Sequence, residues 1–411
     1  MRRLIQIRAI LIIFILLIDI YLFFALKYLT QNSSAKLRLT ILSVHCIISL
    51  LCIASLFFMG SLPENVRMYV ISIIVGILIA KLITVVILLV DEIRRGVFWT
   101  VKRIIPSKPV TTGIADNAIP RSSFLVWLGI ALGGGFLATF MYGFSNKYNY
   151  RVRNVQINFP NLPASFKGLR ILQLSDIHSG SFSNKQAVNN GVSMALKEKA
   201  DLILFTGDLV NDRAIEMNDY KDVFSRLSAP MGVFSTLGNH DYGDYAQWKS
   251  EGEKAANLEH LKNIHAEIGW RLLMNEHVIF ERNGEKIALI GIENWGAKGH
   301  FPKYGKLDVA YKGTEDIPFK ILMSHDPSHW DAQVRPQYPD IDIMLAGHTH
   351  GMQFGVEIPH FKWSPIQYMY KQWAGLYKTG KQYLYVNRGY GFLGYPGRVG
   401  ILPEITVIEL V

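Results

Sequence analysis

The chain has 411 residues and a formal net charge of +10; half of its residues are hydrophobic and 18% are charged. This composition excludes a disordered or coiled-coil protein, and two cysteines exclude a disulfide framework and a zinc finger. Residues 1–150 hold 15 basic and 5 acidic side chains, whereas residues 151–411 hold 28 of each. The basic excess therefore belongs to the first third, and we expect no nucleic acid among the partners of the rest.

Four apolar segments in the first third predict transmembrane helices at about residues 9–28, 39–61, 68–90 and 122–144. About 20 apolar residues span a bilayer core. The alternative, helices buried in a large soluble protein, is disfavoured because none of the segments has a polar face. We therefore expect residues 1–146 to form the transmembrane region of a multi-pass cell-membrane protein, and residues 147–411 to form a separate domain.

Two charged residues, Asp19 and Lys81, lie inside the predicted spans, where an unpaired charge is costly. The first and third helices run parallel, so the two side chains are expected to pair. We favour a structural pair over a proton or ligand site. Cys46 and Cys52 lie six residues apart in the second helix, and we expect two free thiols in the core of the helices.

Lysines and arginines in the short loops predict the orientation, because cytoplasmic loops carry an excess of them. The first and third loops contain nine, including Lys108, whereas the N-terminus and the second loop contain four. Placing the nine in the cytoplasm puts everything after residue 146 outside it. The basic N-terminus favours the opposite orientation.

After Asn154, short β-branched apolar runs alternate with amphipathic stretches near residues 184–199 and 246–268. Strands that alternate with helices predict an α/β domain. A first edge strand is expected within residues 150–167. The further expected strands are 170–174, 202–205, 232–236, 287–292, 319–323, 341–345, 383–386 and 405–410.

Polar clusters follow five of these runs, and ligands in α/β sheets bind at the carboxyl ends of strands. Pairs two residues apart share a face of an extended segment, and a lone carboxylate such as Asp208 can bridge two metal ions. Nitrogen and oxygen donors without thiolate suit manganese, iron, zinc or magnesium. One such histidine would be an ordinary core or surface residue, but five clusters in order predict a metal site. The clusters contain Asp176 and His178; Asp208; Asn239, His240 and Asp241; His325; and His348 and His350.

The series Asp176-x-His178, Gly207-Asp208, Gly238-Asn239-His240-Asp241, His325 and Gly347-His348-Thr349-His350 resembles the calcineurin-like metallophosphoesterases over roughly residues 150–411. The resemblance implies two packed β-sheets flanked by helices, with two divalent metal ions between them. It assigns Asp176, His178 and His350 to one ion, Asn239, His325 and His348 to the other, and Asp208 to both. It makes His240 the catalytic histidine, oriented by Asp241. His329 is the alternative to His325.

The membrane helices and the stretches Ser324–Trp330 and Asn387–Glu404 resemble the bacterial membrane-anchored phosphodiesterase branch of that family. This implies hydrolysis of a phosphodiester or pyrophosphate bond in a lipid-linked or cell-envelope substrate, with manganese as the first choice of metal. One alternative is a UDP-2,3-diacylglucosamine hydrolase of lipid A biosynthesis. Another is a non-enzymatic membrane sensor with a phosphoesterase-like domain. The sequence predicts no oligomeric state.

Two further features bear on the substrate. Arg388 and Arg398 are candidate phosphate binders, although surface ion pairing is an equal alternative for single arginines. An aromatic segment follows His350, with lysines at positions 362 and 371; it suits either a bilayer interface or an ordinary core and active-site wall. Its aromatic residues are Phe361, Trp363, Tyr368, Tyr370, Trp373 and Tyr377.

Overall fold

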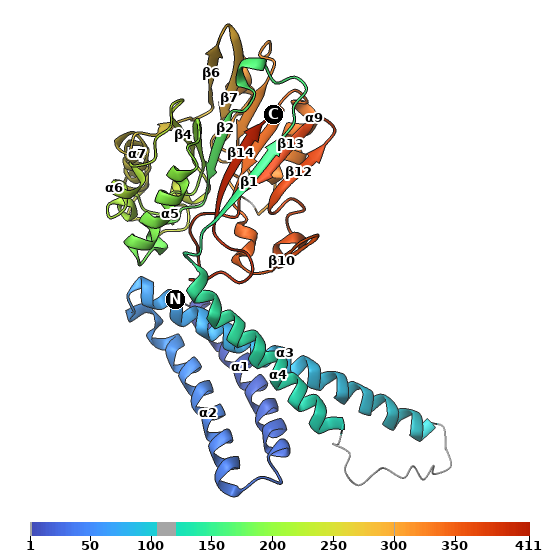
Figure 1. Cartoon of the computed structure of the whole chain (residues 1–411). Coiled ribbons are helices and arrows are strands. Elements are labelled where there is room, and N and C mark those ends of the chain that lie inside the picture. The colour runs from blue at the N-terminus through green and yellow to red at the C-terminus, as the bar shows by residue number, and fades with distance from the viewer. Residues whose placement is uncertain (1, 105–120, 300) are drawn as a thin grey trace. The chain divides into compact units, whose positions relative to one another are not determined.

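The computed structural model describes residues 2–104, 121–299 and 301–411. Lys108, one of the loop cations counted above, lies outside the described residues. The chain divides into two compact units, Met1–Tyr142 and Gly143–Val411. Figure 1 shows the helices of the first unit in blue to green and the strands of the second in green to red.

The described part of the first unit contains four long helices, α1 (Arg2–Leu29), α2 (Ala35–Phe58), α3 (Glu64–Ile104) and α4 (Arg121–Gly143). Each is long and apolar enough to cross a membrane, which confirms the predicted number. The third helix continues well past its expected end at residue 90. Beyond residue 90, charged residues form ion pairs one helical turn apart, with Arg94 2.8 Å from Asp91 and Arg95 2.5 Å from Glu92. Such pairs stabilise a helix, so α3 continues through this charged segment.

The predicted pair of Asp19 and Lys81 is confirmed. Lys81 Nζ donates to Asp19 Oδ1 at 2.6 Å and to Ser49 Oγ at 3.0 Å, so α1, α2 and α3 meet at one buried ion pair. The expectation of two core thiols is wrong for one of them, because Cys52 is buried but Cys46 is exposed. Six residues turn a helix by about 600°, so the two side chains cannot share one face.

We expect Lys81→Met to lower the yield of folded protein, because it leaves the Asp19 carboxylate buried without a counter-charge. Breaking a buried pair in this way costs about 3–5 kcal/mol. Adding Asp19→Asn should restore part of the yield, measured as the monodisperse fraction in size-exclusion chromatography in detergent. Lys36→Met, at an exposed position of α2, is the control. The absence of any rescue would contradict a structural role for the pair.

The second unit is built on two six-stranded sheets (Figure 1). The central strands of both run parallel: β2, β3 and β4 in the first sheet, and β13, β9, β8 and β7 in the second. The first sheet has the order β1 (Arg151–Ile157), β14 (Glu404–Leu410), β2 (Arg170–Leu174), β3 (Leu202–Thr206), β4 (Val233–Thr236) and β5 (Arg271–Leu272). The second has the order β12 (Gly375–Thr379), β13 (Gln382–Val386), β9 (Ile343–Ala346), β8 (Lys320–Met323), β7 (Glu285–Gly291) and β6 (Glu276–Arg282).

The main core lies between the two sheets, where Ile171 and Leu204 of the first sheet belong to the same buried cluster as Leu289 and Ile321 of the second. A second cluster joins the alternate residues of the second sheet, such as Leu322, to α8 (Leu307–Tyr311). The helices α5 (Lys185–Lys197) and α7 (Glu251–Glu267) lie beside the first sheet in Figure 1. This is the α/β arrangement that the sequence predicted.

Every predicted strand and both predicted helices are present, with ends shifted by a few residues. The prediction missed the two-residue strand β5, the antiparallel edge strands β6 and β12, and a hairpin of β10 (Val356–Ile358) and β11 (Phe361–Trp363). These strands mix exposed and half-buried residues, so they lack the continuous apolar runs that mark strands covered on both faces.

Candidate metal centre

The expected ligands come together where the parallel strands of both sheets end. The loops after β2, β3 and β4 come from the first sheet, and the loops after β8 and β9 come from the second. Within the described residues, two groups of donors have ligand atoms within 4.8 Å of one another. The first group is Asp176, His178 and His350, and the second is Asp208, His325 and His348.

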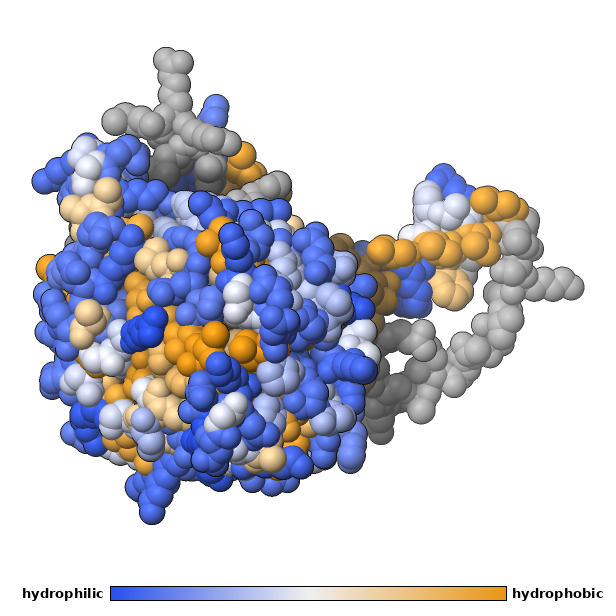
Figure 2. Space-filling view, turned by 90° about the horizontal axis from the view of Figure 1, so that it is seen from above, coloured by the Kyte–Doolittle hydropathy of each residue, from blue (hydrophilic) through white to orange (hydrophobic). Residues whose placement is uncertain are grey.

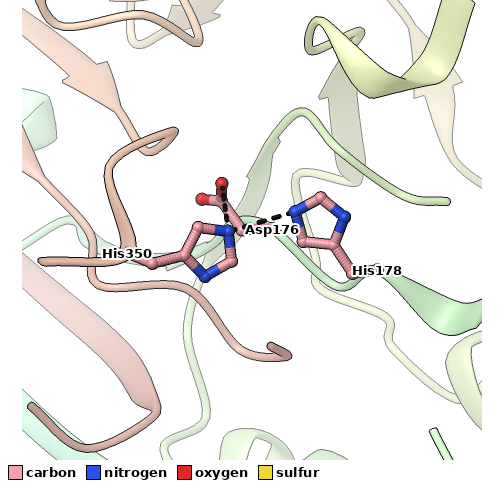
Figure 3. A group of neighbouring side chains, drawn as sticks. All are labelled: Asp176, His178 and His350. Atoms are coloured by element: carbon pink, nitrogen blue, oxygen red, sulfur yellow. Dashed lines mark hydrogen bonds and ion pairs between the residues drawn. The ribbon is translucent and has the colours of Figure 1, made fainter. Parts of the chain in front are cut away.

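The first group is drawn in Figure 3. The Nε2 atoms of His178 and His350 are 3.0 Å apart, and His350 Nε2 is 3.2 Å from Asp176 Oδ1. Burial holds the pKa of His178 well below its usual value, so this imidazole is neutral, the form that binds metal ions. Two imidazole nitrogens and a carboxylate that face one point are arranged as a cation requires.

The second group is organised around Asp208. His325 Nδ1 donates to the Thr206 carbonyl at 2.7 Å, which leaves Nε2 free, 3.1 Å from Asp208 Oδ2. A hydrogen bond of this kind fixes the tautomer of a metal-binding histidine. The same Asp208 oxygen is 3.6 Å from His178 Nε2 in the first group. One carboxylate therefore reaches both groups, as a bridging ligand must.

Asn239 joins the second group through its side-chain oxygen. Its Oδ1 lies 2.8 Å from His348 Nδ1, so an amide oxygen and an imidazole nitrogen approach each other beside Asp208. His329, the alternative to His325, lies elsewhere: its Nδ1 is 3.0 Å from Ser324 Oγ and its Nε2 is 2.9 Å from Gln333 Oε1. The structure thus brings His325, and not His329, to the centre.

The backbone at the centre is strained. Five of the candidate ligands adopt a left-handed conformation that is unfavourable for residues other than glycine. Each such residue costs on the order of 1–3 kcal/mol and persists where the surroundings impose it, often at functional sites. The five are Asp176, His178, Asp208, His348 and His350, with φ between 48° and 72°. All the donor atoms are nitrogen or oxygen, and together with the strained backbone at the ligands this arrangement fits divalent cations.

Glycines directly precede three of the candidate ligands, Asp208, Asn239 and His348, and of these three glycines only Gly207 has a positive φ, at 96°. At Gly347 a Cβ would lie 1.9 Å from Ser175 Oγ and 2.2 Å from Asp176 Oδ2. At Gly238 it would lie 2.2 Å from Asp208 Oδ1. The absence of a side chain at these two positions therefore makes room for Ser175 and for the candidate ligands Asp176 and Asp208.

The expectation that Asp241 orients His240 is wrong. The Asp241 carboxylate accepts hydrogen bonds from the backbone N–H groups of Asp208, Leu209, Val210 and Gly238 at 2.8–3.3 Å, so it holds the two ligand loops together. Burial and the Asp208 charge raise the pKa of Asp241 to about 7. His240 is oriented instead by the Asn211 carbonyl, which accepts from its Nδ1 at 2.7 Å.

The two arginines proposed to bind phosphate are engaged inside the protein. Arg388 is 2% exposed and pairs with Glu404 at 2.5 Å and Glu357 at 2.6 Å. Arg398 is fully buried and donates to the carbonyls of Arg388, Gly389 and Gly391. Both the phosphate-binding role and the surface ion pair are therefore wrong, because these guanidinium groups support the loops behind the centre.

Sequence reasoning missed two tyrosines at the centre. The Tyr370 hydroxyl is 2.9 Å from His348 Nε2 and 3.3 Å from Asp326 Oδ2. The Tyr245 hydroxyl accepts from Asn239 Nδ2 at 3.0 Å. In the sequence, Tyr370 was one of several aromatic residues of its segment. For Tyr245, the only indication of a place in the site was its position six residues after Asn239. The aromatic segment thus serves partly as the wall of the site.

Comparisons with known proteins agree with this geometry. Residues 1–147 match the family "Probable Calcineurin-like phosphoesterase, transmembrane domain", and residues 169–352 match the family "Calcineurin-like phosphoesterase". A transmembrane protein with metallophosphoesterase domain from Danio rerio is 32% identical over 72% of this chain, and the match spans 65% of that relative's length.

Two bacterial relatives match about three fifths of the chain. Phosphodiesterase YaeI of Escherichia coli is 28% identical over 62% of this chain and 85% of its own length. UDP-2,3-diacylglucosamine pyrophosphatase LpxG of Chlamydia trachomatis is 29% identical over 59% of this chain and 83% of its own. The matched residues 169–352 contain all seven candidate ligands. With both segments matched, the chain belongs to the calcineurin-like phosphoesterases, in a form that carries four transmembrane helices.

Proposed function

We propose that this protein is a membrane-anchored phosphoesterase that uses two divalent metal ions to hydrolyse a phosphodiester or pyrophosphate bond. The observation that carries the proposal is the position of Asp208, whose Oδ2 lies 3.1 Å from His325 Nε2 and 3.6 Å from His178 Nε2. One carboxylate oxygen within reach of both donor groups is the arrangement of a two-metal site. Family membership supports the same activity.

The proposed ligand sets follow the two groups. Asp176, His178 and His350 would hold one ion, Asn239, His325 and His348 would hold the other, and Asp208 would contribute to both. When bound, two such cations would supply a more acidic water molecule and positive charge to offset the negative charge of the phosphoryl oxygens. We propose manganese, with iron, zinc and magnesium also compatible with nitrogen and oxygen donors.

His240 carries the proton chemistry of the proposed reaction. Because its Nδ1–H donates to the Asn211 carbonyl, its Nε2 is the atom that remains for the substrate. Its ring lies 4.9 Å from that of His178, which places it beside the centre without joining either ligand group. His240 Nε2 can hold a proton for the leaving oxygen or donate a hydrogen bond to a phosphoryl oxygen.

We propose a lipid-linked or cell-envelope substrate, since the site is tethered to four membrane helices. The name of the relative LpxG adds UDP-2,3-diacylglucosamine as a specific candidate. A non-enzymatic membrane sensor is disfavoured because none of the seven ligand positions has lost its donor. The substrate test is an assay of the purified full chain with Mn²⁺ against a phosphomonoester, a diester and UDP-2,3-diacylglucosamine.

That assay needs an Asp208→Ala preparation purified in parallel, because contaminating phosphatases would act equally in both. Turnover of the diester or the diphosphate only by the unaltered protein supports the proposal. Equal turnover by the two preparations, or none with any substrate despite bound metal, would contradict it.

We expect a reporter fused after Val411 to indicate an extracytoplasmic location. The physical reason is the excess of loop cations that this orientation keeps in the cytoplasm, nine against four. The measurement is a pair of fusions, to a phosphatase active only outside the cytoplasm and to a fluorescent protein active only inside. A cytoplasmic signal would overturn the orientation, and it would favour the nucleotide-linked lipid because nucleotides are cytoplasmic.

A further inference from the structure

The hairpin of β10 and β11 forms a small sheet of its own, apart from both six-stranded sheets. Its strands are antiparallel, with Val356 opposite Trp363 and Ile358 opposite Phe361. Opposed residues in an antiparallel pair share a face, and alternate residues do too. These four residues therefore form one apolar face, and we call the segment 356–363 the apolar hairpin.

The opposite, polar face attaches the apolar hairpin to the rest of the unit. Glu357 accepts from Arg153 of β1 at 2.7 Å and from Arg388 at 2.6 Å. Lys362 Nζ donates to the Ala374 carbonyl at 2.5 Å. With its polar side chains fixed in this way, the hairpin turns its other face outward.

The apolar face is exposed over much of its surface. Val356, Ile358 and Phe361 are 44%, 58% and 54% exposed. Trp363 Nε1 reaches the Tyr368 hydroxyl at 3.5 Å, which extends the patch to Tyr368, 78% exposed, and to Met369. Neighbouring exposed apolar side chains in this number indicate an interaction surface.

The end of the last membrane span lies next to this hairpin, within the same unit. The span ends at Asn146; the Gly143 carbonyl accepts from the Arg398 N–H at 2.9 Å, and the Phe144 and Tyr395 rings are 5.5 Å apart. The same loop holds the base of the hairpin, since the Gly355 N–H donates to the Val399 carbonyl at 2.9 Å. Residues 395–399 thus connect the exit from the membrane to the apolar hairpin.

We propose that the apolar hairpin, with Tyr368 and Met369, inserts into the interfacial layer of the lipid bilayer. The contacts of residues 395–399 indicate that the lipid bilayer is the partner, because a segment bound beside the last residues of a membrane span lies at the membrane surface. Tryptophan and tyrosine are enriched in that layer, and burial of the apolar side chains supplies the free energy. Figure 2 shows the end of this unit that carries β6 and β7, where an apolar area lies among mostly hydrophilic residues.

Membrane contact here would also hold the metal centre at the surface of the bilayer. The ligand His350 begins the short helical segment His350–Gln353, which leads directly into β10. A phosphoester at the depth of lipid head groups could therefore reach the centre without its lipid leaving the membrane. This surface is independent of the proposed activity, and a failure of one does not entail a failure of the other.

The test uses the full chain with Cys46 and Cys52 replaced by alanine and a single new cysteine labelled with a polarity-sensitive fluorophore. The probe position is Ile358→Cys, and the matched control is Ile279→Cys, an exposed isoleucine on β6. Each is placed in nanodiscs of phosphatidylcholine and phosphatidylglycerol that hold one chain. We expect spin-labelled lipid to quench most emission at position 358 and aqueous iodide to quench little; position 279 should show the reverse.

Two results would overturn the proposal. Quenching at position 358 by iodide and not by spin-labelled lipid would show that the hairpin stays in water. Protection from both quenchers would show that protein covers it, either another part of this chain or, if protection appears only when discs hold several chains, a second copy. Neither reading depends on turnover, so the result stands whether or not a substrate is known.

Discussion

Replacing Asp208 with alanine is expected to reduce turnover more than any other single ligand substitution. Its Oδ2 approaches His178 Nε2 and His325 Nε2, one from each donor group, so its loss weakens the binding of both ions. Its Oδ1 also accepts a hydrogen bond from the backbone N–H of His240 at 2.9 Å, so the proposed catalytic histidine would lose a contact that positions it. We expect a loss on the order of 10³-fold or more, with fewer metal ions per chain by elemental analysis.

Three comparisons make the Asp208 result specific. Asp208→Asn keeps the shape of the side chain and removes its charge. It therefore separates the loss of the bridging carboxylate from the backbone strain that alanine has at a positive φ. Asp219→Ala, an exposed carboxylate nearby in the chain, controls for the loss of one charge. If Asn239→Ala proved far more damaging than either Asp208 variant, the bridging role would be wrong.

Replacing His240 with alanine is expected to leave both metal ions bound and to lower turnover on the order of 10²–10⁴-fold. The ring is held by the Asn211 carbonyl and belongs to neither group of candidate ligands. If His240 protonates the leaving oxygen, a substrate with an acidic leaving group such as nitrophenolate should suffer less than an alkyl ester. The measurements are kcat on both substrates and metal content.

The His240 experiment has a matched control in His260→Ala, an exposed histidine of α7, which should leave both turnover and metal content unchanged. Equal losses on the two substrates would indicate that His240 stabilises phosphoryl charge and does not act as an acid. A chain that binds fewer ions after His240→Ala would show that this residue is a ligand, and the proton-transfer role would have to be abandoned.

The part of the site that could be predicted from sequence is the part that local rules determine. Asp176 and Asp208 each lie two residues after the end of a buried strand. Neighbouring parallel strands end at one edge of a sheet, so the convergence of these side chains follows from strand positions alone. The choice of His325 over His329 is local in the same way, because only the first stands at the tip of β8. The same rule predicted the two central sheets.

The roles that could not be predicted depend on pairings across the fold. Arg388 meets Glu357 and Glu404 only after β10 and β14 are in place, and no local pattern around Arg388 indicates that its charge is buried. Asp241 follows His240 directly, yet its carboxylate reaches backbone of the Asp208 loop more than thirty residues earlier. Antiparallel edge strands such as β12 depend on their neighbours more than on their own residues.

The metal content of the purified full chain tests the central claim most directly. The protein, loaded with Mn²⁺ and freed of excess ion, is measured by elemental analysis and assayed on a diester before chelation, after it and after Mn²⁺ is returned. The two donor groups predict about two ions per chain, with activity lost on chelation and recovered with the ions. A well-folded chain that binds no metal, or whose activity survives complete removal of metal, would contradict the two-metal centre.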